Sequence, residues 1–412
     1  MINLPELTTL DNGLRIIVED LPFVRSISFG IWVKNGSRDE TAELNGISHF
    51  IEHMLFKGTE KRTAKEIADV MDAVGGQMNA YTTKEHTCFY TRTLDTHFDI
   101  ALDVLSDMFF NAKFDNEEIK KERNVILEEI SMYEDSPDDL VHDLLQQAIY
   151  KNDTLGYRVL GTPESIAAVD NAAIKAYMSR RYTPQTTLIA VAGNIKNSDV
   201  VGKIKEIFGV NFAAPTAPAA ATQFYTPAFI KKEKDIEQVH LCFGYPGIPT
   251  GVPEMYDLAA LNSILGGGMS SRLFQKIREE RGLSYAIYTY PTSFIETGIF
   301  SIYAALAPQQ TDEVTELILA EVKALFTDKV SQIQLDKTKE QIKSSFIMSL
   351  ESAANRMTSI GRQMLMLDKI VTPDELITKI DQITLDSFYA LAEKIFQKDQ
   401  MSLAMVGNIP KN

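Results

Sequence analysis

The 412-residue chain has few cysteines, no excess of positive charge and no long hydrophobic run. Its only two cysteines, Cys88 and Cys242, exclude a disulfide framework and are typical of a protein from a reducing compartment. A net charge of −15 argues against a nucleic-acid binder, because phosphate contacts need clustered lysine and arginine. An acidic surface suits solubility and basic peptide substrates.

Two further absences concern membranes and export. The first residues, MINLPELTTLDNGLRIIVEDL, lack a charged stretch followed by an apolar run, and nowhere do 18 apolar residues follow one another. We therefore expect a soluble, cytoplasmic protein with neither a membrane nor a nucleic-acid partner.

The length of the chain suggests two or more domains, and an internal repeat indicates how they arise. TTLIAVAGNIKN, starting at Thr186, recurs as MSLAMVGNIPKN, starting at Met401. Thr-Pro-Glu from Thr162 and Thr-Pro-Asp from Thr372 are separated by nearly the same interval. Chance similarity of short strings is the alternative to a duplication.

We accordingly predict an α+β fold with two similar domains from an internal duplication. Each would be a mainly antiparallel sheet with helices packed on one side. The zinc-binding domain is expected at 1–212 and a similar domain without the metal site at 225–412. The small, proline-interrupted stretch between them, 213–224, has the composition of a linker.

Hydrophobic spacing and turn residues place the elements of the first domain. Two helices are expected near 46–58 and 64–74, and helices dominate from about 95 to 182. Strands are expected at 7–10, 14–20, 26–33, 78–94 as a pair, and 186–195.

The strongest local pattern is GISHFIEHMLFKG, residues 46–58. Its apolar residues recur with the spacing of a helix that buries one face. On such a helix His49 and His53 project from the same side about one turn apart, close enough to hold one zinc ion. Asn45 or Ser48 could cap the start of this helix.

Glu52 lies beside the two histidines on this helix. A carboxylate there can take a proton from a metal-bound water without being a ligand, which hydrolytic zinc sites require. The order His-x-x-Glu-His reverses the zincin signature and is the inverzincin motif. Because the chain contains six histidines, such a pattern can arise by chance, so a third ligand is needed to support it.

A candidate third ligand lies in the predicted helix FDNEEIKKERNVILEEISMYED, residues 114–135. Glu128 shares its helix face with polar residues, whereas Glu129 shares its face with aliphatic ones. A buried carboxylate is costly unless a positive charge meets it, so the pattern favours Glu129 over Glu128. Glu122, two turns earlier, is predicted to orient a ligand histidine; an ordinary half-exposed charge is the alternative.

HFIEHMLFKGT, followed by ERNVILEEI at the end of a later helix, resembles the pitrilysin/insulinase family of zinc peptidases. The resemblance runs over essentially the whole chain and is strongest to the short, two-domain branch that includes mitochondrial processing peptidase subunits and bacterial relatives. It implies one Zn²⁺ per chain, with His49, His53 and Glu129 as ligands. Glu52 would be the catalytic base and Glu122 the supporting acid.

The resemblance also implies where a peptide binds. QMNAYTTKEHTCFY, residues 77–90, resembles the edge strand to which an extended substrate adds as a further strand in this family. Asn79, Ala80 and Tyr81 would lie beside the peptide. An internal strand is the alternative.

The second half of the chain has no His-x-x-Glu-His pattern in LGGGMSSRLFQKIREERGLSYAIY, residues 265–288, so it cannot hold metal by the same route. Arg278 and Tyr285 resemble a pair that in this family reaches the zinc site from a facing domain. A guanidinium and a phenol there could bind substrate backbone and stabilise an oxyanion. The run Gly266, Gly267 and Gly268 resembles the glycine-rich loop of the family's non-catalytic processing subunit. A glycine-rich turn with charges on a helix surface is the alternative.

These observations predict a metalloendopeptidase that hydrolyses peptides or unfolded polypeptides. One alternative is a non-catalytic processing or core-type subunit that binds peptides or partner chains, and another is a metal hydrolase of non-peptide substrates. Longer family members carry four such domains around a chamber. The resemblance therefore implies a homodimer in which the second domain of one chain faces the zinc site of the other, unless a related chain takes the partner's place.

Overall fold

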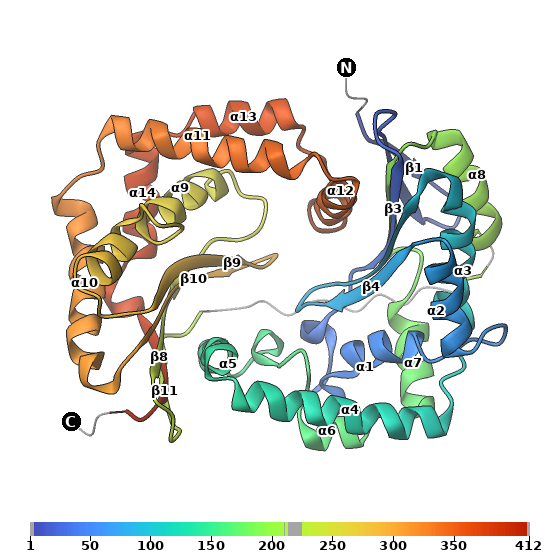
Figure 1. The fold of residues 1–412 in the computed structure, drawn as a ribbon, viewed down its shortest axis with the longest axis horizontal. Coiled ribbons are helices and arrows are strands. Elements are labelled where there is room, and N and C mark those ends of the chain that lie inside the picture. The colour runs from blue at the N-terminus through green and yellow to red at the C-terminus, as the bar shows by residue number, and fades with distance from the viewer. Residues whose placement is uncertain (1–3, 210, 213–224, 410–412) are drawn as a thin grey trace. The chain divides into compact units, whose positions relative to one another are not determined.

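A computed structural model describes residues 4–209, 211–212 and 225–409, and its elements are labelled in Figure 1. The chain forms two compact units, each built around one sheet. The predicted linker at 213–224 lies outside the described residues. Among the described residues, no helix has both the length and the apolar character needed to cross a membrane.

The first unit contains a six-stranded sheet and the helices that pack on it. Its strands are β1 (Glu6–Thr9), β2 (Arg15–Asp20), β3 (Ser26–Val33), β4 (Gln77–Thr82), β5 (Thr87–Leu94) and β6 (Thr187–Gly193). Its helices are α1 (Ile47–Leu55), α2 (Ala64–Ala73), α3 (Phe98–Asn111), α4 (Asn116–Asp135) as far as Ile130, α6 (Pro163–Ala167), α7 (Asn171–Arg181), α8 (Asn197–Phe208) and α12 (Ala353–Leu367).

The second unit contains a five-stranded sheet. Its strands are β7 (Phe229–Glu233), β8 (Val239–Pro246), β9 (Ala286–Ser293), β10 (Gly298–Leu306) and β11 (Ser402–Gly407). Its helices are α5 (Pro137–Ile149), α9 (Met255–Leu265), the π-helix η5 (Phe274–Glu279), α10 (Thr311–Thr327), α11 (Gln332–Ser349) as far as Ile347, α13 (Pro373–Asp381) and α14 (Leu385–Ile395).

The strand orders of the two sheets confirm the predicted duplication. The strand order is β1-β2-β6-β3-β5-β4 in the first sheet and β7-β11-β8-β10-β9 in the second. Without its edge strand β1, the first sheet has five strands that correspond one by one, in spatial order, to those of the second. In each sheet the corresponding pair, β2 with β6 and β7 with β11, is parallel, and the remaining pairs are antiparallel. The predicted α+β class with mainly antiparallel sheets is therefore confirmed.

The repeated Gly-Asn-Ile strings have one structural cause. Gly193 and Gly407 end β6 and β11 with φ angles of +154° and +136°, a backbone region that favours glycine. A Cβ atom at Gly193 would come within 2.5 Å of the backbone oxygen of Ser26, and one at Gly407 within 2.4 Å of that of Gln238. Both repeats therefore need glycine at the same turn out of the sheet.

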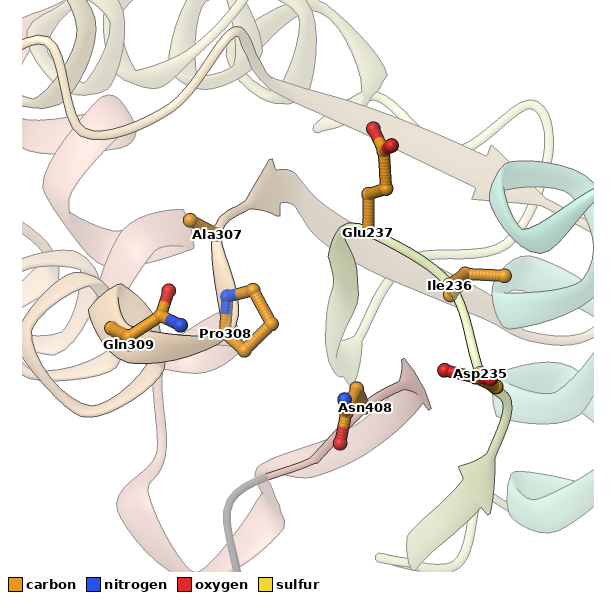
Figure 2. Close-up of a pocket in the computed structure, with 7 residues that line it drawn as sticks. All are labelled: Asp235, Ile236, Glu237, Ala307, Pro308, Gln309 and Asn408. Atoms are coloured by element: carbon orange, nitrogen blue, oxygen red, sulfur yellow. The ribbon is translucent and has the colours of Figure 1, made fainter.

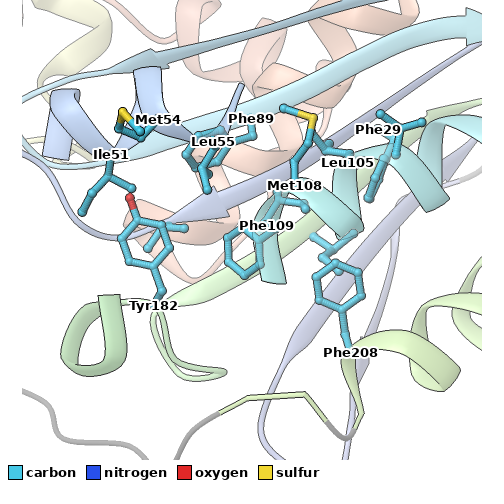
Figure 3. Packing of buried hydrophobic residues seen from close by; sticks show 14 of the residues in the cluster. Phe29, Ile51, Met54, Leu55, Phe89, Leu105, Met108, Phe109, Tyr182 and Phe208 are labelled. Carbon is cyan, nitrogen blue, oxygen red and sulfur yellow. The ribbon is translucent and has the colours of Figure 1, made fainter. Parts of the chain in front are cut away.

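The core of the first unit lies between one face of its sheet and a helical layer. Figure 3 shows Ile51, Met54 and Leu55 of α1 packed together with Met108 and other residues of α3 and the sheet. Each of these three α1 side chains is at most 1% exposed. Burial of a side chain of this size contributes roughly 1.5–3 kcal/mol, so the core holds α1 firmly by its apolar face.

The opposite face of each sheet is covered by a helix from the other half of the sequence. Ser131–Gly156, which contains α5, groups with the second unit, and Met348–Thr372, which contains α12, groups with the first. α12 packs on β2, β3 and β6, and α5 packs on β8 and β11. The predicted domain limits, 1–212 and 225–412, remain a prediction, and the compact units differ from them by these two exchanged segments.

The exchanged helix α12 is anchored to the sheet by a buried ion pair. Arg356 Nη1 lies 2.5 Å from Glu19 Oε1, and both side chains are 6% exposed. Burial raises the pKa of Glu19, and the neighbouring guanidinium of Arg356 opposes that rise. A second pair between the same strand and helix, Arg15 with Asp368, lies at the surface, where the Asp368 side chain is 79% exposed.

We predict that Arg356→Met destabilises the protein by about 3–5 kcal/mol, because Glu19 is then left as a buried, unpaired charge. Arg15→Gln is the matched control and should cost only about 0–1 kcal/mol, as expected for an exposed pair. Urea unfolding followed by circular dichroism measures both values. Equal costs for the two variants would contradict this account of how α12 is held.

Candidate metal centre

The structure places the two motif histidines on one side of α1, as predicted. The apolar residues of this helix are buried at 0–1% exposure, which leaves His49 and His53 on another face. The two imidazole rings lie with their centroids 4.5 Å apart. The side chain of His49 is 11% exposed and that of His53 is 22% exposed. Ligands on adjacent turns of a helix can therefore approach a common point.

The start of α1 differs from the prediction. The residue at the N-cap position is Gly46, which has a φ of +92° and no side chain, so neither Asn45 nor Ser48 occupies that position. The backbone N–H groups of Gly46 and Ser48 are instead bonded to the carboxylate of Glu40. Local sequence spacing did not indicate this partner, because Glu40 lies outside the window in which helix caps are found.

The structure brings Glu129 of α4 to the two histidines. Glu129 Oε2 lies 3.8 Å from His49 Nε2 and 3.7 Å from His53 Nε2. One ligand atom from each of the three residues lies within 4.8 Å of the others, the single grouping of this kind in the described part of the chain. Tetrahedral zinc bonds of about 2.0–2.1 Å would place ligand atoms roughly 3.3 Å apart, so small side-chain shifts suffice.

The choice of Glu129 over Glu128 rested on the faces of α4. Glu128 is exposed, whereas Glu129 is partly buried and points to the histidines. The predicted apolar face is only partly buried, however, because Ile126 is fully buried while Val125 is 50% exposed. The helical spacing thus identified the side of α4 that faces the histidines without showing how far its apolar residues are covered.

Glu122 is buried and connects His53 to Lys57. Its Oε1 atom lies 2.8 Å from His53 Nδ1, and its Oε2 atom lies 2.6 Å from Lys57 Nζ. Burial acts to raise the pKa of Glu122, but the hydrogen bonds from His53 and Lys57 outweigh it and lower the pKa. The ionised carboxylate accepts the Nδ1 proton of His53, which leaves Nε2 as the atom that faces Glu129.

Glu52 is held beside the histidines by the sheet. Thr82 at the end of β4 donates a hydrogen bond from Oγ1 to Glu52 Oε2 at 2.6 Å. Burial and, to a lesser extent, the nearby carboxylate of Glu129 raise the pKa of Glu52, and the hydrogen bond from Thr82 opposes this rise. A carboxylate with a raised pKa is better matched to proton transfer near neutral pH than an exposed one.

The sequence analysis did not include Lys57 or Thr82. Lys57 follows His53 by four positions, but its partner Glu122 lies on a different helix. Thr82 alternates with Ala80 along β4, which puts both residues on the α1 side of the sheet. That alternation was a usable signal, but only once β4 was known to lie beside α1.

The charges of the centre fit a divalent cation. Burial and the neighbouring His53 lower the pKa of His49 to about 3, so its imidazole is neutral, the form that binds metals. Burial also raises the pKa of Glu129; His53 opposes this rise, and the nearby carboxylate of Glu122 increases it. Two imidazole nitrogens and one carboxylate oxygen are a donor set found in catalytic zinc sites. The residues present therefore fit Zn²⁺.

The predicted peptide-binding segment is an edge strand. β4 pairs with β5 and is the last strand of its sheet in the described part of the chain. Asn79 is exposed, and Ala80 and Tyr81 are partly exposed. The Tyr81 ring packs edge-on against Trp32, on the face of the sheet that α12 covers. The prediction that these residues contact a peptide remains a prediction.

The remaining predicted residues lie in the second unit. Gly266 directly follows α9 and begins the glycine run, which continues with Gly267 and Gly268. The Arg278 guanidinium carbon lies 5.2 Å from the centroid of the Tyr285 ring, and Tyr285 is 78% exposed. Arg278 and Tyr285 thus form a local cation–π pair. Their predicted role at the zinc site remains a prediction.

A hollow in the second unit is unrelated to these predicted residues. It has a volume of about 440 Å³, and Figure 2 shows Asp235, Glu237, Pro308 and Asn408 among its lining side chains. None of its lining residues belongs to the predicted metal, catalytic or peptide-binding sets.

Both halves of the chain match known proteins. Residues 15–163 match the family described as Insulinase (Peptidase family M16), and residues 168–342 match the domain described as Peptidase M16 inactive domain. The chain is 44% identical over 409 residues to the uncharacterized zinc protease YmxG of Bacillus subtilis, which covers 98% of each protein. An uncharacterized zinc protease of Streptomyces coelicolor is 38% identical over 97% of this chain and 89% of that protein.

Two solved structures share the fold, each with a TM-score of 0.92 over 99% of this chain and 100% of the other. One is a protease from Helicobacter pylori, 21% identical, and the other a peptidase M16 inactive domain from Pseudomonas fluorescens, 18% identical. The two family descriptions together cover most of the chain, and the relatives match over nearly its whole length. This chain therefore belongs to peptidase family M16, the pitrilysin/insulinase family, as a member with two similar domains.

Proposed function

We propose that this protein is a zinc-dependent endopeptidase that hydrolyses peptides or unfolded polypeptides. The observation that carries the proposal is the convergence of His49, His53 and Glu129 within 4.8 Å, with Glu52 on the same helix as the histidines. Membership of peptidase family M16 and the zinc protease names of the relatives support both the metal and the reaction class.

The side chains of the centre divide the work of hydrolysis. Zn²⁺ bound by His49, His53 and Glu129 would supply a Lewis acid that polarises a peptide carbonyl and makes water more acidic. Glu122 holds the Nδ1 proton of His53 and so orients the ring for metal binding. Glu52 Oε2 is occupied by the Thr82 hydroxyl, which leaves Oε1 to take a proton from the attacking water and pass it to the leaving amine.

The edge strand β4 gives this chemistry a substrate class. An extended peptide that pairs with the backbone of an edge strand is recognised mainly through main-chain hydrogen bonds. Such pairing selects flexible or unfolded segments, because a folded protein rarely offers a free strand. Asn79, Ala80 and Tyr81 would line the peptide, and Thr82 at the end of the same strand bonds Glu52.

We further propose that the protein acts as a homodimer in which Arg278 and Tyr285 of one chain serve the metal centre of the other. Cyclic dimers are the commonest oligomers of soluble proteins. The guanidinium would stabilise the charge that develops on the attacked carbonyl oxygen, and the exposed phenol of Tyr285 would bind substrate backbone. The glycine run formed by Gly266, Gly267 and Gly268 would contact the same peptide.

We predict that Glu52→Gln lowers peptide cleavage by roughly 10²–10⁴-fold, because the amide cannot carry the transferred proton. The variant should still bind one zinc per chain, since Glu52 is not a ligand. Cleavage of unstructured peptides and metal content are the measurements, with the exposed Glu128→Gln as the matched control. Cleavage that persists in the variant would show that Glu52 is not the base. A wild-type protein that binds zinc and peptides without cutting them would indicate a non-catalytic subunit.

We predict that Glu129→Gln weakens zinc binding by more than the ~10–100-fold that loss of a supporting residue typically costs, because a ligand oxygen is removed. Glu128→Gln removes the same charge from the adjacent, exposed position and should leave the affinity unchanged. Competition with a chromophoric chelator measures both affinities and the number of zinc ions per chain. Equal affinities for the two variants would remove Glu129 from the ligand set.

The dimer proposal predicts complementation between two inactive variants. Glu52→Gln and Arg278→Met, co-expressed with different tags, should regain about a quarter of wild-type activity, because half of the dimers are mixed and each mixed dimer has one complete site of two. Each variant alone should be inactive or nearly so, whereas Arg281→Met at a neighbouring exposed arginine should remain active. Activity no higher than the sum of the separate variants would contradict the shared site.

A further inference from the structure

The first turn of α1 cannot be capped by its own N-cap residue. The backbone N–H groups of a first helical turn have no partners within the helix and need acceptors from elsewhere. At the N-cap position Gly46 adopts a left-handed φ of +92°. A Cβ atom there would lie 2.7 Å from the backbone oxygen of Leu160 and 2.8 Å from the side chain of Ile166, so serine, asparagine or aspartate cannot take this position.

Glu40, six residues upstream of Gly46, supplies the missing acceptor. Its Oε2 atom accepts hydrogen bonds from the Gly46 N–H at 2.6 Å and from Asn45 Nδ2 at 2.9 Å. Its Oε1 atom accepts one from the Ser48 N–H at 2.8 Å. Glu40 is only 4% exposed. Both oxygens therefore face N–H donors of the first turn, where the positive end of the helix dipole also favours a carboxylate.

A second set of contacts ties the same turn to the rest of the first unit. Ser48 Oγ accepts a hydrogen bond from Asn35 Nδ2 at 3.0 Å and lies 3.2 Å from the Tyr177 hydroxyl. The Tyr177 hydroxyl donates to Asn35 Oδ1 at 2.9 Å, which closes a ring of three buried polar side chains. The backbone on either side of Ser48 N–H is thus clamped between Glu40 and this ring, directly before His49.

We propose that Glu40 is a positioning residue for the metal centre. By fixing the first turn of α1 it sets the rotation of the helix and hence the direction in which the imidazole of His49 points. Each residue turns a helix by about 100°, so a turn that unwinds or shifts at residues 46–48 displaces His49 first and His53 less. Metal ligands must be held within about 0.5 Å of their productive geometry. This inference rests on the proposed zinc site.

Glu40→Gln tests the inference with a nearly isosteric change. The NH₂ group of glutamine would face the N–H donor of either Gly46 or Ser48 and cannot accept from it, so at least one hydrogen bond to the first turn is lost. Glu43→Gln is the matched control, because Glu43 lies three residues further on and is exposed. Both variants replace a carboxyl group by an amide, but only the first loses contacts to α1.

The measurements are the affinity for Zn²⁺ by chelator competition and the visible absorption bands of the Co²⁺-substituted protein. Glu40→Gln should bind Zn²⁺ about 10–100-fold more weakly and give altered Co²⁺ bands, as for other residues that orient ligands. Glu43→Gln should match the wild type in both. A folded Glu40→Gln variant with wild-type affinity and bands would overturn the inference.

If Glu40→Gln does not fold, Glu40→Asp provides the test, because it keeps the charge but withdraws the carboxylate by one methylene. It should show weaker Zn²⁺ binding with changed Co²⁺ bands, and unchanged values would again overturn the inference. A wild-type protein that binds no Zn²⁺ would instead refute the proposed function itself. The two failures are therefore distinguishable.

Discussion

The candidate metal centre depends on how α1 is held against its surroundings. Its apolar side chains are buried in the core of the first unit. In its first turn, the Ser48 backbone N–H is bonded to Glu40 and the Ser48 hydroxyl to Asn35. A nine-residue helix has little stability of its own, because helix formation in water needs a longer chain or tertiary support. Packing and capping together therefore decide where the two imidazoles point, and only a fixed helix can present them to Glu129 of α4.

Sequence spacing predicted the parts of the centre that follow from a single helix. The four-residue interval between His49 and His53 fixes their relation wherever the helix lies. Glu129 was favoured over Glu128 because the two project from different sides of α4, and the structure brings Glu129 to the histidines. The choice depended only on which side of α4 each glutamate lies, so it did not require Val125 on the same side, which is 50% exposed, to be buried.

The residues that the sequence did not reveal act between different helices, strands and turns. Thr82 reaches Glu52 from a strand, and Glu40 reaches the start of α1 from a preceding turn. Lys57 is near His53 in sequence, but its partner Glu122 belongs to a different helix. Hydrophobic periodicity reports which face of an element is buried and carries no information about which polar groups meet there. Supporting contacts of this kind require coordinates.

The same limit explains the two exchanged helices. α5 and α12 are both amphipathic, and an apolar face is satisfied by either of two similar sheets. Nothing in their residues distinguishes a helix that covers its own sheet from one that crosses to the other. The duplication, by contrast, was predicted from repeated strings such as Gly-Asn-Ile, whose glycines make the same tight turn in both halves.

The crossing of α5 and α12 has a consequence for the origin of the chain. A half-length chain with one repeat would leave one face of its sheet bare unless a second copy lent its helix, as in a helix-swapped pair. Fusion of two such genes would preserve that interlacing within one polypeptide. Neither repeat, severed from the other, keeps the helix that covers the second face of its sheet.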